Sequence, residues 1–265
     1  MSDLKPIYWG LLALVLTACE QPENPNPPAE STASVTTPEG IAETQAALPA
    51  SPFYALRTQD NRWPDLTPDL LSSDMLANNY YIILDGSGSM ASDTCAPGST
   101  KMDVAKAAVK QFIQQISPTA NIGLFVFDRN GIQQRVELAA QNREQLFNKI
   151  DQIQPDGHTP LKTALNFGYE QLSHQGARQM GYGEYHLVVV TDGLASATEE
   201  PDAIVETIIE QSPVMIHSVG FCIDDKHSLN QPGKTAYTAA ANADELQQGL
   251  AAVLAESATF DPDQF

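Results

Sequence analysis

Apolar residues are spaced along this chain in two ways, one typical of strands and one typical of helices. Short, nearly continuous apolar runs indicate strands that are buried on both faces, as in a parallel sheet. Segments with an apolar residue at every third or fourth position indicate helices with one buried face. The predicted strands are residues 80–84, 121–128, 133–138, 186–191, 214–223 and 236–239. The predicted helices are residues 100–116, 142–153, 160–173, 201–209 and 244–256.

Strands and helices alternate over residues 79–258, which predicts one doubly wound α/β domain around a mostly parallel sheet. The shorter and more polar strand at 133–138 is expected at an edge of that sheet. Local signals mark the start of two helices. Thr100 begins a pattern that resembles a capping box, with Asp at the position where Glu is usual. Thr159 followed by Pro160 predicts an N-cap and a first helical position.

The beginning of the chain has the pattern of a bacterial lipoprotein signal. Lys5 precedes an apolar run at 7–16, which is too short to cross a bilayer but has the length of a signal-peptide core. The run leads into Leu16-Thr17-Ala18-Cys19, which resembles a lipobox with cleavage before the cysteine. The resemblance implies a signal peptide at 1–18 and acylation of Cys19 with chains such as palmitate, and several chains on one residue anchor a protein stably. Glu20 differs from the aspartate that marks inner-membrane retention, so we expect the outer membrane, on its periplasmic or surface face.

Two segments of different composition lie between this signal and the domain. Residues 19–52 are rich in Pro, Ala, Ser, Thr and Glu and have almost no large apolar residue, which is typical of a disordered tether. Residues 53–78 contain aromatic and leucine side chains, and we expect them to pack on the domain. Residues 259–265 form a tail after the last predicted helix.

The chain is strongly acidic, with 14 Lys and Arg residues against 33 Asp and Glu residues and a formal net charge of −19. This charge disfavours nucleic acid as a partner, because few basic residues are available to neutralise phosphates. It gives no attraction to anionic lipid either, so we expect contact with the membrane only through the lipid anchor. The acidity either keeps a secreted protein soluble or attracts cations and basic partners.

Oxygen-bearing side chains stand where predicted strands end and where a predicted helix begins. Asp85, Ser87 and Ser89 follow the first strand at alternate positions, Asp192 follows the strand at 186–191, and Thr159 precedes a helix. The carboxyl ends of parallel strands meet at one edge of an open α/β sheet, where such sheets bind ligands. Carboxylate and hydroxyl oxygens are hard ligands that suit Mg²⁺ and similar ions. The sequence therefore predicts a divalent-cation site at this edge.

The order and spacing of these five residues closely resemble the metal-ion-dependent adhesion site of von Willebrand factor type A domains. In that family the two serines and the threonine coordinate Mg²⁺, Mn²⁺ or Ca²⁺ directly or through water, and the aspartates do so partly through water. A Glu or Asp of a protein partner completes the coordination. The resemblance implies these roles for Asp85, Ser87, Ser89, Thr159 and Asp192. It also implies a module that binds protein, for adhesion or scaffolding, without catalysis.

Two other functions remain open at this point. A metal-dependent hydrolase would use the same cation to activate water, but Ser87 has no evident general base beside it. The metal could also serve only to stabilise the domain. His158 adjoins Thr159, and Asp224 and Asp225 follow a strand end, but we interpret all three as solvent-exposed loop residues. His174, His186, His217 and His227 show no metal-binding spacing, and we interpret them as structural.

Cys95 and Cys222 remain when Cys19 is set aside, and the expected compartment is oxidising. In the sheet order of the resembled family, both cysteines belong to the metal-bearing edge. The resemblance therefore favours a disulfide that braces this edge, and two unpaired cysteines are the alternative.

Overall fold

The structure is a computed structural model that describes residues 63–223 and 225–257. The signal peptide, Cys19, the tether at 19–52, the first part of the segment 53–78, Asp224 and the tail at 259–265 lie outside the described residues. In the part of the chain that the structure describes, no helix has the length and apolar character needed to cross a membrane.

A mixed sheet of six strands forms the centre of the domain, in the order β3-β2-β1-β4-β5-β6. The strands are β1 (Asn79–Asp85), β2 (Asn121–Asp128), β3 (Gly131–Ala139), β4 (Tyr185–Thr191), β5 (Met215–Phe221) and β6 (Ala236–Ala240). All neighbours are parallel except β2 and β3, which are antiparallel. The predicted fold class is confirmed, and β3 lies at an edge as its polar sequence indicated.

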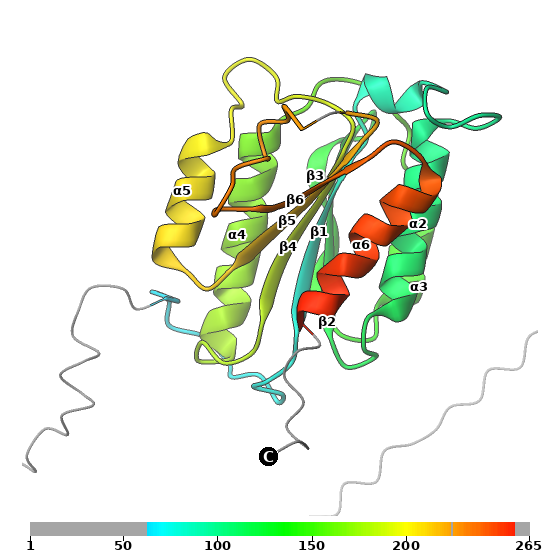
Figure 1. The fold of residues 1–265 in the computed structure, drawn as a ribbon. Coiled ribbons are helices and arrows are strands. Elements are labelled where there is room, and N and C mark those ends of the chain that lie inside the picture. The colour runs from blue at the N-terminus through cyan, green and yellow to red at the C-terminus, as the bar shows by residue number, and fades with distance from the viewer. Residues whose placement is uncertain (1–62, 224, 258–265) are drawn as a thin grey trace, which may run out of the picture. The chain divides into compact units, whose positions relative to one another are not determined.

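Helices cover both faces of the sheet, so that the domain has three layers (Figure 1). The elements outside the sheet are η1 (Gly88–Ala91), α2 (Lys101–Gln115), α3 (Arg143–Asp151), α4 (Leu161–Arg178), α5 (Asp202–Gln211) and α6 (Ala243–Ser257). Apolar side chains of α2, α3 and α6 pack on one face, together with Tyr80, Ile82 and Leu84 of β1. Those of α4 and α5 pack on the other face, together with Tyr81 and Ile83. Strand β1 is therefore buried on both faces, as its apolar run predicted.

The two predicted helix starts have different outcomes. The capping box is present, because Thr100 Oγ1 accepts a hydrogen bond from the Asp103 N–H at 3.1 Å and Asp103 Oδ2 accepts one from the Thr100 N–H at 3.2 Å. The prediction of Thr159 as an N-cap is wrong, since Pro160 occupies the N-cap of α4 and no side chain caps this helix. Instead, the Thr159 carbonyl accepts hydrogen bonds from the N–H groups of Leu161 and Ser196, both at 3.0 Å. The Thr159 hydroxyl is thus not used to cap the helix.

Helix α4 is longer than predicted because its last turns pack against Trp63. The Trp63 indole donates a hydrogen bond from Nε1 to Ser173 Oγ at 3.0 Å. A Cβ placed on Gly176 would lie 2.3 Å from this indole ring, so only glycine allows the contact. The same ring meets Tyr185, the first residue of β4, edge to face with ring centroids 4.7 Å apart. Within the described part of the segment 53–78, Trp63 thus packs on α4 and β4 as expected, whereas the leucines do not pack and remain exposed, namely Leu66, Leu70, Leu71 and Leu76.

Candidate metal centre

The carboxyl ends of β1 and β4 bring the two predicted aspartates together. These strands are parallel neighbours, and the last paired residues are Leu84 and Val190. The next residue of β1 is Asp85, which is fully buried. Its Oδ2 accepts a hydrogen bond from Thr191 Oγ1 at 2.6 Å, across the two strand ends. Asp192, the residue after Thr191, is also buried.

The loop after β1 folds back so that its two serines gather beside Asp85. The Ser87 N–H donates to Asp85 Oδ1 at 2.7 Å, which fixes the first step of the turn. The hydroxyl oxygens of Ser87 and Ser89 are 3.1 Å apart. The turn requires Gly86, because a Cβ there would lie 2.8 Å from both Asp128 Cβ and the Phe127 carbonyl oxygen.

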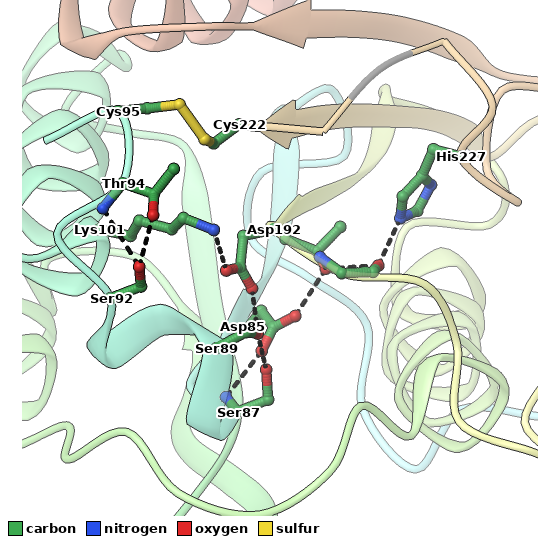
Figure 2. A network of polar contacts seen from close by, with 12 residues as sticks. Asp85, Ser87, Ser89, Ser92, Thr94, Cys95, Lys101, Asp192, Cys222 and His227 are labelled. Carbon is green, nitrogen blue, oxygen red and sulfur yellow. Dashed lines mark hydrogen bonds and ion pairs between the residues drawn. A yellow bond between two sulfur atoms is a disulfide. The ribbon is translucent and has the colours of Figure 1, made fainter.

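Asp192 connects the serine cluster to a lysine. Its Oδ1 accepts a hydrogen bond from Ser89 Oγ at 2.7 Å, and its Oδ2 accepts one from Lys101 Nζ, also at 2.7 Å. Figure 2 shows these side chains converging from the loop after β1, the start of α2 and the end of β4. The ends of three separate elements thus place one connected polar network at the edge of the sheet.

Thr159 approaches the same network from the loop before α4. Its side chain is buried, and its backbone N–H donates to Ser196 Oγ at 2.9 Å. A Cβ placed on Gly193 would lie 3.6 Å from Thr159 Oγ1 and 3.8 Å from Ser89 Oγ, so both hydroxyls flank this glycine. All five residues that the sequence predicted as metal ligands therefore gather at one place.

The chemistry of this set fits a hard divalent cation. It offers two carboxylates and three hydroxyls, and oxygen ligands of these kinds suit Mg²⁺. Burial raises the pKa of Asp85 to about 6, and the charge of Asp192 acts in the same direction, although hydrogen bonds from Ser87 and Thr191 oppose the rise. A buried carboxylate is costly unless it is paired, and a bound cation would offset that cost. Among the described residues no three His, Cys, Asp or Glu side chains form a metal-binding group, so a metal here depends on the hydroxyls.

A disulfide braces the same edge. Cys95, in the loop between η1 and α2, is bonded to Cys222, the residue after β5, and their Cα atoms are 6.0 Å apart. Both residues have a positive φ, 61° and 60°. Figure 2 shows the bond joining the chain before α2 to the end of β5. The pairing that the family resemblance favoured is thus the one found in the structure.

Three residues of the network were not predicted from the sequence. Thr191 and Lys101 contact the two aspartates directly, as described above. His227 supports the loop that carries Asp192, because its Nε2 lies 2.7 Å from the Gly193 carbonyl oxygen. Its Nδ1 accepts a hydrogen bond from the Leu229 N–H at 2.9 Å, so Nε2 carries the proton and donates to that carbonyl. Thr191 could have been found from the sequence because it directly precedes Asp192, whereas no sequence pattern identifies His227.

The remaining candidates from the sequence lie away from the network. His158 and Asp225 are exposed, and so is His174 on α4. His186 and His217 are buried in the sheet, where His186 Nδ1 and His217 Nε2 are 3.1 Å apart.

Comparison with known proteins agrees with this fold. Residues 79–251 match the profile of the family described as von Willebrand factor type A domain. An uncharacterized protein of Bacillus subtilis (strain 168), YwmD, is 25% identical over 201 residues, which cover 69% of this chain and 87% of the relative.

Solved structures with the same fold are also found, at lower sequence identity. The hypothetical protein BatB from Bacteroides thetaiotaomicron has a TM-score of 0.53 at 14% identity, covering 68% of this chain and 98% of that one. A von Willebrand factor type A structure from Catenulispora acidiphila has a TM-score of 0.54 at 18% identity, covering 69% of this chain and 43% of that one. These similarities concern the fold alone. The match over residues 79–251 shows that the chain belongs to the von Willebrand factor type A family.

Proposed function

We propose that this protein is a metal-dependent protein-binding module of a bacterial envelope lipoprotein, used for adhesion or scaffolding. The observation that carries the proposal is the convergence of Asp85, Ser87, Ser89, Thr159 and Asp192 at one edge of the sheet. The edge is open to a partner, because Gly88 and Ser89 are exposed while the two aspartates beneath them are buried.

The hydroxyls of Ser87, Ser89 and Thr159 would hold the cation, and the aspartates would orient them. Asp85 fixes the turn through the Ser87 N–H and Asp192 accepts the hydrogen bond of Ser89. The cation, Mg²⁺ or alternatively Mn²⁺ or Ca²⁺, would supply an electrophilic position for a Glu or Asp carboxylate of the partner. Neutral hydroxyl ligands would leave most of the positive charge of the ion available to that carboxylate.

An exposed apolar side chain beside the site supports a protein as the partner. Leu194 follows Gly193 directly and is 59% exposed. An apolar side chain next to the site could pack against a protein partner, and in protein interfaces a few central residues supply most of the binding energy.

Catalysis is less well supported by the same geometry. A hydrolase would need a general base near the activated water. His227 has its two ring nitrogens engaged by Gly193 and Leu229, and both oxygens of Asp85 accept hydrogen bonds. These contacts favour recognition over hydrolysis, and a metal that only stabilises the domain is the other alternative.

The proposed location is the outer membrane, through lipid on Cys19. The tether at 19–52 would let the domain reach partners at a distance from the membrane. The net charge of −19 favours solution over the surface of anionic lipid.

The test is calorimetric titration of Mg²⁺, Mn²⁺ and Ca²⁺ into the full chain, with Asp85→Ala as the site variant. Asp151→Ala is the matched control, because it makes the same charge change at an exposed position on α3. We expect micromolar to millimolar binding that Asp85→Ala abolishes and Asp151→Ala preserves. Envelope proteins should be retained by the Mg²⁺-loaded wild type, and lost with EDTA or with Asp85→Ala. Equal retention by the Mg²⁺-loaded wild type and by Asp85→Ala would overturn metal-dependent recognition. If EDTA lowers the melting temperature but leaves retention unchanged, the metal has only a structural role.

A further inference from the structure

Lys101 is a buried cation inside the candidate metal centre. Its side chain is 9% exposed, the side chain of its partner Asp192 is fully buried, and Nζ and Oδ2 are 2.7 Å apart. Lysine is rarely buried to this degree unless its charge is paired. Among the ion pairs of the described residues, the others lie outside the metal centre, and most of them are more exposed.

The loop that carries the serines also fixes the position of Lys101. The Lys101 N–H donates to the Ser92 carbonyl at 2.8 Å, and Ser92 follows η1, in which Ser89 lies. Thr100, the residue before Lys101, is the N-cap of α2, and its capping box fixes where the helix begins. Lys101 is therefore placed by the same turn that places Ser89, and the ammonium group is a built part of the site.

Asp192 divides its two oxygens between the two halves of the site. Oδ1 faces the serine hydroxyls and Oδ2 faces Lys101. The ammonium group can therefore hold the carboxylate in place without occupying the space beside the hydroxyls. It also brings a positive charge close to the position where the metal would bind, and like charges at short range repel each other.

We propose that Lys101 is an internal counter-ion that keeps the site assembled without metal and lowers its affinity for divalent cations. The proposal rests on the proposed metal-binding function. In the metal-free protein, Lys101 neutralises Asp192, which would otherwise be a buried and unpaired charge. In the metal-bound protein, the same ammonium opposes the cation, so that the ion binds reversibly and with moderate affinity.

Removal of the charge should therefore have opposite effects on two quantities. The metal-free protein should lose stability, because breaking a buried ion pair by removing one partner leaves an uncompensated charge. Affinity for Mg²⁺ should rise, because the repulsion is gone and Asp192 is free to face the cation. A residue with only a structural role would lower both.

The experiment compares Lys101→Met with Lys110→Met in the full chain. Lys110 lies on the same helix and forms a partly exposed ion pair with Asp151, so its substitution makes the same charge change away from the site. Mg²⁺ affinity is measured by calorimetry, and melting temperature is measured in EDTA and in saturating Mg²⁺. We expect Lys101→Met to bind Mg²⁺ about tenfold more tightly than wild type, to melt lower in EDTA, and to recover in Mg²⁺. Lys110→Met should keep the Mg²⁺ affinity of wild type.

Equal or weaker Mg²⁺ affinity in Lys101→Met, with wild type binding normally, would overturn the role of Lys101 and leave the proposed function intact. Absence of Mg²⁺ binding by wild type would overturn both. Lys101→Gln provides a second neutral side chain, for which the same changes are expected. If neither variant folds in saturating Mg²⁺, the proposal is also wrong, because the bound cation should then hold Asp192 in place of Lys101.

Discussion

Thr191 and Asp85 join the ends of the two strands that carry the candidate metal centre, through a hydrogen bond of 2.6 Å from Thr191 Oγ1 to Asp85 Oδ2. Both residues are fully buried. The threonine thus satisfies one carboxylate oxygen, while the Ser87 N–H satisfies the other. It orients Asp85 without being one of the five predicted ligands.

Replacement of Thr191 with Val should leave Asp85 Oδ2 without its donor in a buried position. We expect the free energy of unfolding to fall by about 1–3 kcal/mol, and the affinity for Mg²⁺ to fall with it. Urea denaturation and calorimetry would measure the two effects. Thr207→Val on α5 is the control, because its hydroxyl donates to the Ala203 carbonyl on an exposed surface, away from the site. A similar loss in both variants would contradict the special role of Thr191.

The stability of the metal-free protein should depend on the ionisation of Asp85. Burial raises its pKa from 3.8 to about 6, so the folded state binds the proton more tightly than the unfolded state. The contribution of Asp85 to stability is therefore fully present below about pH 4 and is lost as the pH rises through 6. The loss should be roughly 3 kcal/mol in EDTA. Unfolding of wild type and Asp85→Asn in urea at pH 4 to 7 would isolate it, because other groups titrate equally in both proteins. An unchanged difference between them across this range would contradict the raised pKa.

Gly86 and Gly88 provide a matched pair of substitutions in one loop. An added Cβ at Gly86 would lie 2.8 Å from the Phe127 carbonyl oxygen, whereas one at Gly88 would lie no closer than 3.6 Å to its nearest neighbour. Backbone atoms cannot move aside easily, so Gly86→Ala should destabilise the domain by about 1–3 kcal/mol and displace the serines from their positions. Gly88→Ala should be close to neutral. Thermal unfolding and Mg²⁺ titration of both variants would measure this contrast, and equal behaviour would show that the loop adapts freely.

Reduction of the disulfide between Cys95 and Cys222 should loosen the edge of the sheet that carries the candidate metal centre. The bond closes a long loop, with a sequence separation of 127 residues, so its removal should cost about 2–5 kcal/mol. The double variant Cys95→Ser with Cys222→Ser, measured without reductant, should behave like wild type that has been reduced with dithiothreitol. Both should be less stable and bind Mg²⁺ more weakly than oxidised wild type. Dithiothreitol should have no effect on the double variant. If reduced wild type keeps the full Mg²⁺ affinity, then the bond stabilises the fold without organising the site.

The sequence predicted the strands and the gathering of the five candidate ligands because both depend on local patterns. An apolar run followed by Asp85 or by Asp192 specifies a buried strand with a carboxylate at its end, and parallel pairing then brings the ends together. The capping box at Thr100 was predictable for the same reason. Each of these patterns is contained within a few consecutive residues of the chain.

Contacts between residues that are far apart in the sequence could not be predicted from local patterns. Lys101 and Asp192 are 91 residues apart, and their pairing requires the start of α2 to lie against the end of β4. The cap of α4 was predicted wrongly because the Thr159 carbonyl, held by Leu161 and Ser196, turns the chain so that the hydroxyl faces Gly193. The length of α4 depended on Trp63, whose contact with Gly176 has no signal in helical periodicity.

The position of Trp63 has a mechanical consequence. This residue packs against Tyr185 at the start of β4, and Asp192 follows the other end of the same strand. A strand of this length spans roughly 20 Å, so β4 separates the contact with Trp63 from Asp192 by the length of the sheet. The chain itself enters the sheet at Asn79 and reaches Asp85 at the end of β1, the parallel neighbour of β4. A force applied before Trp63 would therefore reach Asp85 along the covalent backbone of β1, and would reach Asp192 through the ring contact with Tyr185 and the pairing of β1 with β4.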